Sequence, residues 1–205
     1  MKTLGPVRRR RGFTLIELLV VMAVAAVLMF ISMPVLMTTL RASKMRGVAQ
    51  EATVLMRQAR LDAIKTSAQA VVRLVPATPA EPIGRIEAFS DRNADGKLDA
   101  GEPVLGRVEL PSRVSFKEPG GGTDKSSVTG FTDNPEDATM PNVALFQRDG
   151  AIAAIGAFRF GDDSDNFLEV RVAPAATARI EVRKWNDAKS DWFANGDGGE
   201  AWSWK

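Results

Sequence analysis

The feature that most constrains this chain is an uncharged apolar run close to its start. Residues Leu18–Leu36 carry no charged side chain, and as a helix they would extend about 28 Å, enough to cross the hydrocarbon core of a bilayer. Lys2 and the four arginines Arg8–Arg11 precede this run. A secretory signal peptide also starts with basic residues, but its apolar core is usually shorter and ends at a small-residue cleavage site. The pattern predicts a retained single-pass helix with a cytoplasmic N-terminus.

Composition excludes many kinds of chemistry. The 205 residues include no Cys, His or Tyr, which excludes disulfides, thiolate and imidazole zinc sites, cysteine nucleophiles and every His-dependent triad. The formal charge is +2, but five positive charges precede Gly12, so the rest of the chain has 22 basic residues against 25 acidic ones. A mildly acidic body disfavours phosphate-driven binding of nucleic acid. We expect a protein that is not an enzyme and requires no cofactor.

One acidic residue, Glu17, stands at the head of the apolar run. A carboxylate there needs a partner, because burying its charge in lipid is unfavourable. If the chain were cut between Gly12 and Phe13, the new α-amine of Phe13 would lie four residues before Glu17, one helical turn away, and could pair with it. The alternative is that Glu17 rests near the lipid headgroups at the positive N-terminal end of the helix. Composition alone leaves both interpretations open.

The segment Arg11–Val21, RGFTLIELLVV, resembles the class III prepilin signal of type IV pilins and type II secretion pseudopilins. In that family a membrane prepilin peptidase cuts after the glycine and methylates the new N-terminal residue. The resemblance therefore implies cleavage after Gly12 and N-methylation of Phe13. It also implies that Glu17 contacts the N-terminal amine of a neighbouring subunit and that Pro34, which removes a backbone hydrogen bond, bends the helix. Other pilins or pseudopilins would be partners through this helix.

Apolar residues continue at helical spacing after Pro34. They recur at steps of mostly three and four from Leu36 to Ile64, with charged residues between them. A helix from Phe13 to about Ser67 would be roughly 80 Å long, more than one small domain can cover. We expect five segments: a prepilin leader (1–12), a transmembrane helix (13–40), an amphipathic continuation of that helix (41–68), a β-rich periplasmic pseudopilin domain (69–185) and a Trp-rich tail (186–205).

Short runs rich in β-branched residues follow the helix, with Gly, Pro, Asn and Asp clusters between them. Because no helical pattern alternates with these runs, they predict an antiparallel sheet. The expected fold class is α+β, a pilin-like fold in which a long N-terminal helix packs on an antiparallel β-sheet domain. The predicted strands are Ala70–Val75, Gly84–Phe89, Val104–Val108, Val114–Lys117, Asn142–Gln147, Ile152–Phe160, Leu168–Val172 and Ala178–Lys184.

Several blocks beyond the signal are similar to the type II secretion protein H family of minor pseudopilins, also called the GspH/FimT family. They are Leu55–Val75, Gly84–Leu105, Asn142–Ile152 and Arg179–Trp185. The resemblance runs from Arg11 to about Trp185. It implies a minor subunit of a type II secretion pseudopilus or a type IV pilus, held in the inner membrane with its C-terminal domain in the periplasm.

The loop between two predicted strands, Asp91–Glu102, has the spacing of a twelve-position calcium loop. Oxygen-bearing side chains stand at positions 1, 3, 5, 9 and 12, a glycine at 6 and a backbone carbonyl at 7. The candidate ligands are Asp91, Asn93, Asp95, Lys97 (by its carbonyl), Asp99 and Glu102. The same residue types also favour a solvated turn that binds no metal. A membrane-anchored calcium-binding protein is therefore one alternative function.

Basic residues near the last predicted strand suggest a second alternative. Arg179, Arg183 and Lys184 stand beside Trp185, and some FimT-like relatives bind DNA during natural transformation. Glu181 interrupts this basic group, which is more typical of a solvated strand face. The alternative function is a pilus-displayed DNA-binding minor pilin. The tail after Trp185 would dock a neighbour, fold back on the sheet or stay mobile, and its sequence does not separate these outcomes.

Overall fold

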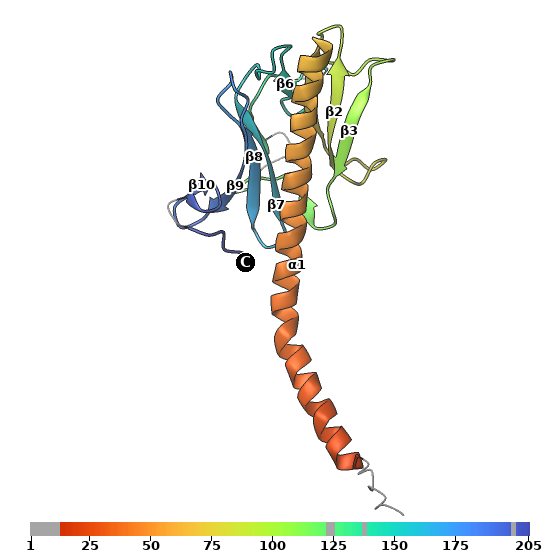
Figure 1. The fold of residues 1–205 in the computed structure, drawn as a ribbon, viewed down its shortest axis with the longest axis vertical. Coiled ribbons are helices and arrows are strands. Elements are labelled where there is room, and N and C mark those ends of the chain that lie inside the picture. Colours follow the sequence, from red (N-terminus) through yellow and green to blue (C-terminus); the bar gives the residue numbers. More distant parts are fainter. Residues whose placement is uncertain (1–12, 122–125, 137–138, 198–199) are drawn as a thin grey trace, which may run out of the picture. The chain divides into compact units, whose positions relative to one another are not determined.

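The computed structural model describes residues 13–121, 126–136, 139–197 and 200–205 (Figure 1). A single long helix, α1 (Leu15–Thr66), comes first within these residues, and strands follow it. The chain divides into two compact units between Leu40 and Arg41, so α1 contributes to both. The strands are β1 (Gln69–Val75), β2 (Arg85–Asp91), β3 (Val104–Glu109), β4 (Val114–Ser115), β5 (Val128–Gly130), β6 (Ala144–Phe146), β7 (Gly156–Asp162), β8 (Phe167–Val172), β9 (Ile180–Asn186) and β10 (Asp191–Phe193).

The start of α1 is capped by Thr14. The backbone N–H of Glu17 donates a hydrogen bond to Thr14 Oγ1 at 3.2 Å, and the N–H of Leu18 donates to the Thr14 carbonyl, as expected of an N-cap residue. The helix continues without a break past Pro34. Its observed bounds confirm the predicted single long helix to within two residues at the start. The bend at Pro34 stays a prediction.

Within the second unit, α1 has one buried face. The small and flexible apolar residues on that face recur at steps of three and four, and Met45, Ala52, Met56 and Ala59 have no exposed surface. Val54 is 61% exposed on the opposite face. The amphipathic pattern in the sequence therefore predicted correctly which side of this half of the helix would be covered.

The strands form two antiparallel sheets. Sheet A has the order β3-β2-β1-β6, and sheet B has the order β10-β9-β8-β7-β4 with β5 also paired to β7 (Figure 1). Neighbouring strands such as β1 and β2 are consecutive in the chain, with Val72 opposite Ala88. The sequence analysis expected antiparallel pairing, which is confirmed, but it missed β5 and β10. Each of these has only three residues, too few for an alternating pattern to stand out.

One main core joins α1 to both sheets. Its largest fully buried side chains include Met56 of α1, Ile86 of sheet A and Phe158 and Leu168 of sheet B. A smaller cluster on the other face of sheet A consists of Val71, Phe89 and Val143, with Leu98 packed against it. The α+β class is therefore observed, with the helix and two sheets sharing a single interior.

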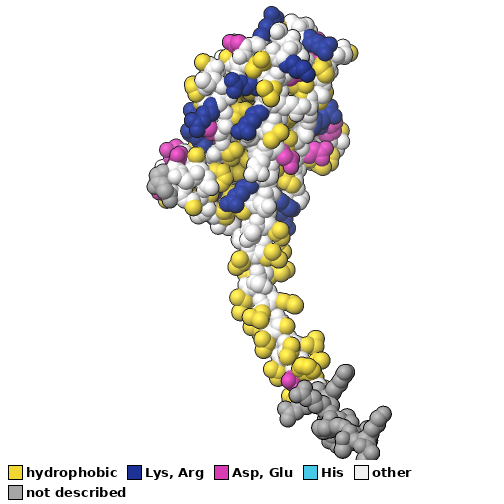
Figure 2. Space-filling model, in the orientation of Figure 1, with side chains coloured by type: hydrophobic (Ala, Val, Ile, Leu, Met, Phe, Trp, Pro, Cys, Tyr) yellow, Lys and Arg dark blue, Asp and Glu magenta, His cyan; other side chains and the backbone are white. Residues whose placement is uncertain are grey.

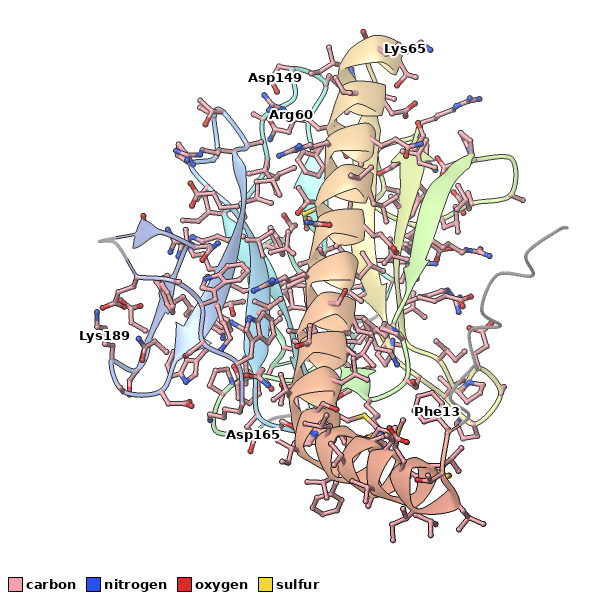
Figure 3. The ribbon with its side chains drawn as sticks, turned by 60° about the horizontal axis from the view of Figure 1, so that its bottom comes forward. Phe13, Arg60, Lys65, Asp149, Asp165 and Lys189 are labelled. Atoms are coloured by element: carbon pink, nitrogen blue, oxygen red, sulfur yellow. The ribbon has the colours of Figure 1, made fainter. Side chains whose placement is uncertain are left out.

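Close packing at the end of α1 holds the helix to the β6–β7 connection. Arg60 Nε donates a hydrogen bond to the carbonyl of Gly150 at 2.9 Å, and Figure 3 shows Arg60 beside Asp149. Gly150 has a φ of +81°, and a Cβ added there would lie 2.6 Å from Cδ1 of Ile64. Only glycine meets both requirements without a shift of its neighbours.

Candidate functional site

The N-terminal segment carries the predicted processing site. Gly12 lies outside the described residues, whereas Phe13 is described and is 80% exposed just before α1. Glu17 follows in the first turn of the helix and is exposed. Among the described residues, no hydrogen bond or ion pair engages its carboxylate. No described group of this chain therefore competes with the predicted partner, the α-amine of another chain, for this carboxylate.

The first unit presents an apolar surface that no described residue of the chain covers. The most apolar window of α1 has a mean hydropathy of 2.7 and no buried residue, and α1 is the one helix in the described part of the chain that is long and apolar enough to cross a membrane. Figure 2 shows hydrophobic side chains along this stretch, and Phe30 is 84% exposed. Soluble domains rarely expose a contiguous apolar surface of this size. This surface is consistent with a membrane anchor.

Residues Asp91–Glu102 form one loop between β2 and β3. The carboxylate of Asp91 is buried and accepts hydrogen bonds from the N–H groups of Ala94 and Gly96, both at 2.7 Å. The carboxylate of Glu102 accepts the N–H groups of Arg92 at 2.7 Å and Asp99 at 3.1 Å. The loop's own backbone therefore binds the two carboxylates that open and close the predicted calcium sequence.

The middle of this loop is also bonded internally. Asn93 Nδ2 donates hydrogen bonds to the carboxylates of Asp95 at 3.2 Å and Asp99 at 2.8 Å, and the N–H of Lys97 donates to Asp95. In the described part of the chain, no three acidic side chains converge as metal ligands do. The structure brings the six candidate ligands into one loop, and their bonds are those of an Asx-type turn. Calcium binding stays an untested alternative to a metal-free turn.

The three basic residues of the DNA hypothesis are not presented together. Arg179 pairs with Glu181 at 2.9 Å and Arg183 pairs with the same carboxylate at 3.4 Å. Lys184 is only 5% exposed, and burial lowers the pKa of its ammonium group. Successive strand residues point to opposite faces, so Arg183 and Lys184 face different ways. Lys184 is therefore unavailable to a phosphate backbone, which corrects its placement in a DNA-facing group.

The Trp-rich tail folds back on the second unit. Strand β10 pairs with β9, with Trp192 opposite Trp185 and their rings 5.4 Å apart in an edge-to-face contact. Trp202 and Trp204 pack against the main core. Figure 3 shows Lys189 on the same side of the molecule as β10. Of the three outcomes that the sequence left open, the described tail residues take the second, folding onto the sheet.

The sequence analysis did not single out the buried carboxylates of the sheets, of which Glu87 and Glu169 pair with arginines. Glu87 is 1% exposed, and it accepts hydrogen bonds from Arg107 at 2.7 Å and from Arg73 at 3.2 Å. Burial alone would raise the pKa of Glu87, but these two arginines outweigh it and hold the pKa below its usual value. Glu87 lies opposite Arg73 on one neighbouring strand and opposite Arg107 on the other, which explains the cluster. In the sequence, the only signal for this cluster was the presence of opposite charges on neighbouring strands.

The second carboxylate, Glu169, lies in sheet B between arginines. Arg159 Nε lies 3.4 Å from Glu169 Oε2, while Oε1 is buried with no hydrogen-bond partner among the described residues. Burial raises the pKa of Glu169, and the attraction of Arg159 only partly offsets this. A buried acid of raised pKa can mark a catalytic group. Here the guanidinium carbon of Arg159 lies 5.2 Å from the centroid of the Trp192 ring. The Arg159–Glu169 pair therefore belongs to the contact between sheet B and the tail.

Comparison with known families identifies the N-terminal segment. A family model described as the prokaryotic N-terminal methylation motif matches residues 7–33. No curated protein and no solved structure matches the chain. The matched residues include the junction between Gly12 and Phe13, Glu17 and most of the exposed apolar part of α1. The motif supports a pilin-like subunit that is processed by prepilin peptidase, and together with the apolar helix it supports membrane anchoring.

Proposed function

We propose that this chain is a minor pilin or pseudopilin that acts by assembly rather than catalysis and needs no cofactor. Prepilin peptidase would cut after Gly12 and methylate Phe13, and the subunit would join a type II secretion pseudopilus or a type IV pilus. The observation that carries the proposal is the methylation motif at residues 7–33, which leads into a helix whose apolar first part is covered by no described residue of the chain. The similarity of later blocks to the type II secretion protein H family favours a minor subunit.

The exposed half of α1 suits such a subunit. In the membrane its side chains contact acyl chains, and in a fibre the same side chains would pack against neighbouring helices. Lipid tails are as apolar as leucine, so close packing and polar contacts decide whether helices associate. Glu17 is the acidic residue in the first turn of this helix. Its pairing with the Phe13 amine of a neighbour would favour the fibre over the dispersed membrane form.

The second unit would lie on the periplasmic side of the inner membrane. The four arginines Arg8–Arg11 favour a cytoplasmic leader, and a single crossing by α1 would place the sheets on the other side. The absence of cysteine is compatible with export, because this unit has a buried core that needs no disulfide.

The N-terminal mass of the protein from membranes tests the proposal. The experiment compares hosts with and without prepilin peptidase. We expect a chain that begins with N-methylated Phe13 only where the peptidase is present, and an intact leader where it is absent. An intact Met1 in both hosts would contradict the proposal and leave a plain membrane anchor.

A Glu17 variant tests assembly separately from processing. Glu17→Ala should still insert and be cut after Gly12, but its amount in isolated fibres should fall by at least about tenfold, the effect of losing roughly 1.4 kcal/mol of interaction. Glu51→Ala is the matched control, because Glu51 is exposed on the same helix within the second unit. Normal incorporation of Glu17→Ala would exclude the proposed pairing with an amine.

A further inference from the structure

The last residues of the chain have no role in the proposed function, yet they make specific contacts with α1. The tail turns back after β10, and its C-terminal end lies beside α1 (Figure 1). Trp204 lies over two cations from distant parts of the sequence. The guanidinium carbon of Arg46 is 5.1 Å from the centroid of its ring, and Nζ of Lys184 is 5.2 Å from it.

This one indole therefore joins two elements of the second unit. Arg46 belongs to the first turns of α1 after Leu40, and Lys184 belongs to β9 of sheet B. A cation over an aromatic ring is attracted by the ring's quadrupole, and the attraction grows when water is excluded. Lys184 is 5% exposed, so its contact is largely dry.

Other contacts hold the same residues in place, but most of them are weak. Trp202 Nε1 donates a hydrogen bond to the carbonyl of Phe193 at 3.3 Å, and the N–H of Lys205 donates to Asn166 at 3.1 Å. Lys205 also forms an ion pair with Asp187, in which both side chains are about half exposed. Exposed ion pairs contribute little to stability. Trp202 and Trp204 therefore supply most of the attachment by burying apolar surface.

The attached state also keeps two polar groups away from water. Nε1 of Trp204 is buried and has no hydrogen-bond partner among the described residues. Lys184 lies within ion-pairing distance of no carboxylate in the described part of the chain, and burial lowers the pKa of its ammonium group. Both groups would regain water if the segment moved away. Burial of apolar surface therefore favours the attached state, whereas the loss of hydration from these two polar groups opposes it.

We propose that residues 200–205 form a clasp that opens while the rest of the second unit stays folded. When it is closed, Trp204 links Arg46 to Lys184 and holds the first turns of α1 in this unit, Arg41–Val48, against sheet B. When it is open, Trp204 leaves both cations, and these turns of α1 separate from β9 more readily. The state of the clasp therefore determines how strongly Arg41–Val48 is held against sheet B. The inference does not depend on the proposed assembly function.

Hydrogen–deuterium exchange on the full-length protein in nanodiscs tests the clasp. In the wild type, residues 200–205 should exchange faster than β7 and β8, since local opening precedes global unfolding. Trp204→Ala should speed exchange of Arg41–Val48 by about tenfold and leave β1 and β2 unchanged, because losing the ring removes a local attachment. Trp192→Ala is the control, since its ring contacts Trp185 of β9 and Arg159 of β7. It should not affect Arg41–Val48.

A second variant separates the clasp from general destabilisation. Lys184→Met keeps an apolar side chain beneath Trp204 but removes the cation that attracts its ring, so it should speed exchange of residues 200–205 by about threefold or more and leave β1 and β2 unchanged. Trp204→Ala that accelerates exchange throughout both sheets, or nowhere, would overturn the proposal. Unchanged or slower exchange of residues 200–205 in Lys184→Met would also overturn it.

Discussion

The two parts of α1 have the same secondary structure but opposite surroundings. In residues Leu15–Leu40 no side chain is buried, and Phe30 is 84% exposed. In residues Arg41–Thr66 one face is covered by the sheets, and Met45, Ala52 and Met56 have no exposed surface. The difference shows that one uninterrupted helix can carry two side-chain patterns, each suited to a different environment. No described residue of the chain covers the first part, whereas the sheets cover one face of the second part.

Side-chain pattern explains this division. The first part is apolar all round, as expected of a helix surrounded by lipid or by other helices. The second part has five alanines on its buried face, where small side chains let the strands approach closely: Ala42, Ala49, Ala52, Ala59 and Ala63. Its other face carries Arg57 and Glu51, which water can solvate.

The largest expected effect comes from placing the same charge in each part. Ala52→Arg should unfold the second unit, because Ala52 is fully buried and an unpaired buried charge costs several kcal/mol. Ala26→Arg should leave that unit folded but reduce membrane insertion, since an arginine near the middle of a membrane helix costs roughly 3 kcal/mol. Circular dichroism and membrane fractionation of both variants measure the two losses. An equal loss of folding in both would contradict the independence of the two parts.

Truncation of a phenylalanine should show the same contrast on a smaller scale. Phe158→Ala in sheet B should lower the free energy of unfolding of the second unit by about 3–5 kcal/mol, because Phe158 is fully buried in the core. Phe30→Ala, the matched control on the exposed part of α1, should change that free energy by less than about 0.5 kcal/mol. Denaturant titration in detergent gives both numbers. A comparable loss in Phe30→Ala would mean that the first part of the helix stabilises the sheets.

A methyl group added to two glycines should have effects of opposite sign. Gly130 has a φ of +65°, and a Cβ there would lie 2.2 Å from the backbone oxygen of Ile155, so Gly130→Ala should destabilise the second unit by more than about 2 kcal/mol. Gly47 lies in α1 with nothing within 4 Å of an added Cβ. Gly47→Ala should therefore stabilise the helix by about 0.5–1 kcal/mol. Thermal unfolding of the two variants distinguishes them, and a destabilised Gly47→Ala would reveal a neighbour on the open face.

The buried ion cluster of sheet A should make stability depend on pH. The pKa of Glu87 is lower in the folded state, so its ionised form stabilises the fold at neutral pH, and this contribution is lost as the pH falls below 4.5 towards the folded-state pKa. Glu87→Gln should cost about 1–2 kcal/mol at pH 7 and progressively less in acid. Urea titrations of both proteins across this range test the sign. A difference that grows in acid would contradict it.

Metal removal is expected to have the smallest effect. Because the loop's own N–H groups already bind Asp91 and Glu102, chelation with EDTA should leave the thermal midpoint of the second unit unchanged. Added calcium should also leave it unchanged. A rise in the midpoint with calcium that Asp95→Ala abolishes, while Asp149→Ala does not, would instead establish the loop as a calcium site.

Much of the fold could be predicted because it depends on residues close together in the chain. Helical spacing between Leu36 and Ile64 predicted most of the buried face of α1, and β-branched runs predicted β1, β2, β3 and β8 to within two residues. Of the candidate site, the residues around Gly12 and Glu17 carry a local motif that the sequence displays in full. The turn at Asp91–Glu102 was also located correctly, although its internal hydrogen bonds were not predicted.

The sequence by itself therefore determined the apolar helix, the processing signal, the antiparallel strands and the α+β class, since each follows from periodicity or composition within a short window. Only the tertiary structure decided the split into two sheets, the burial of Lys184 and the return of Trp204 to Arg46, which stands far earlier in the chain. These features arise when distant segments compete to cover the same apolar surface. The pattern within a short stretch of sequence does not show which of these segments packs on that surface.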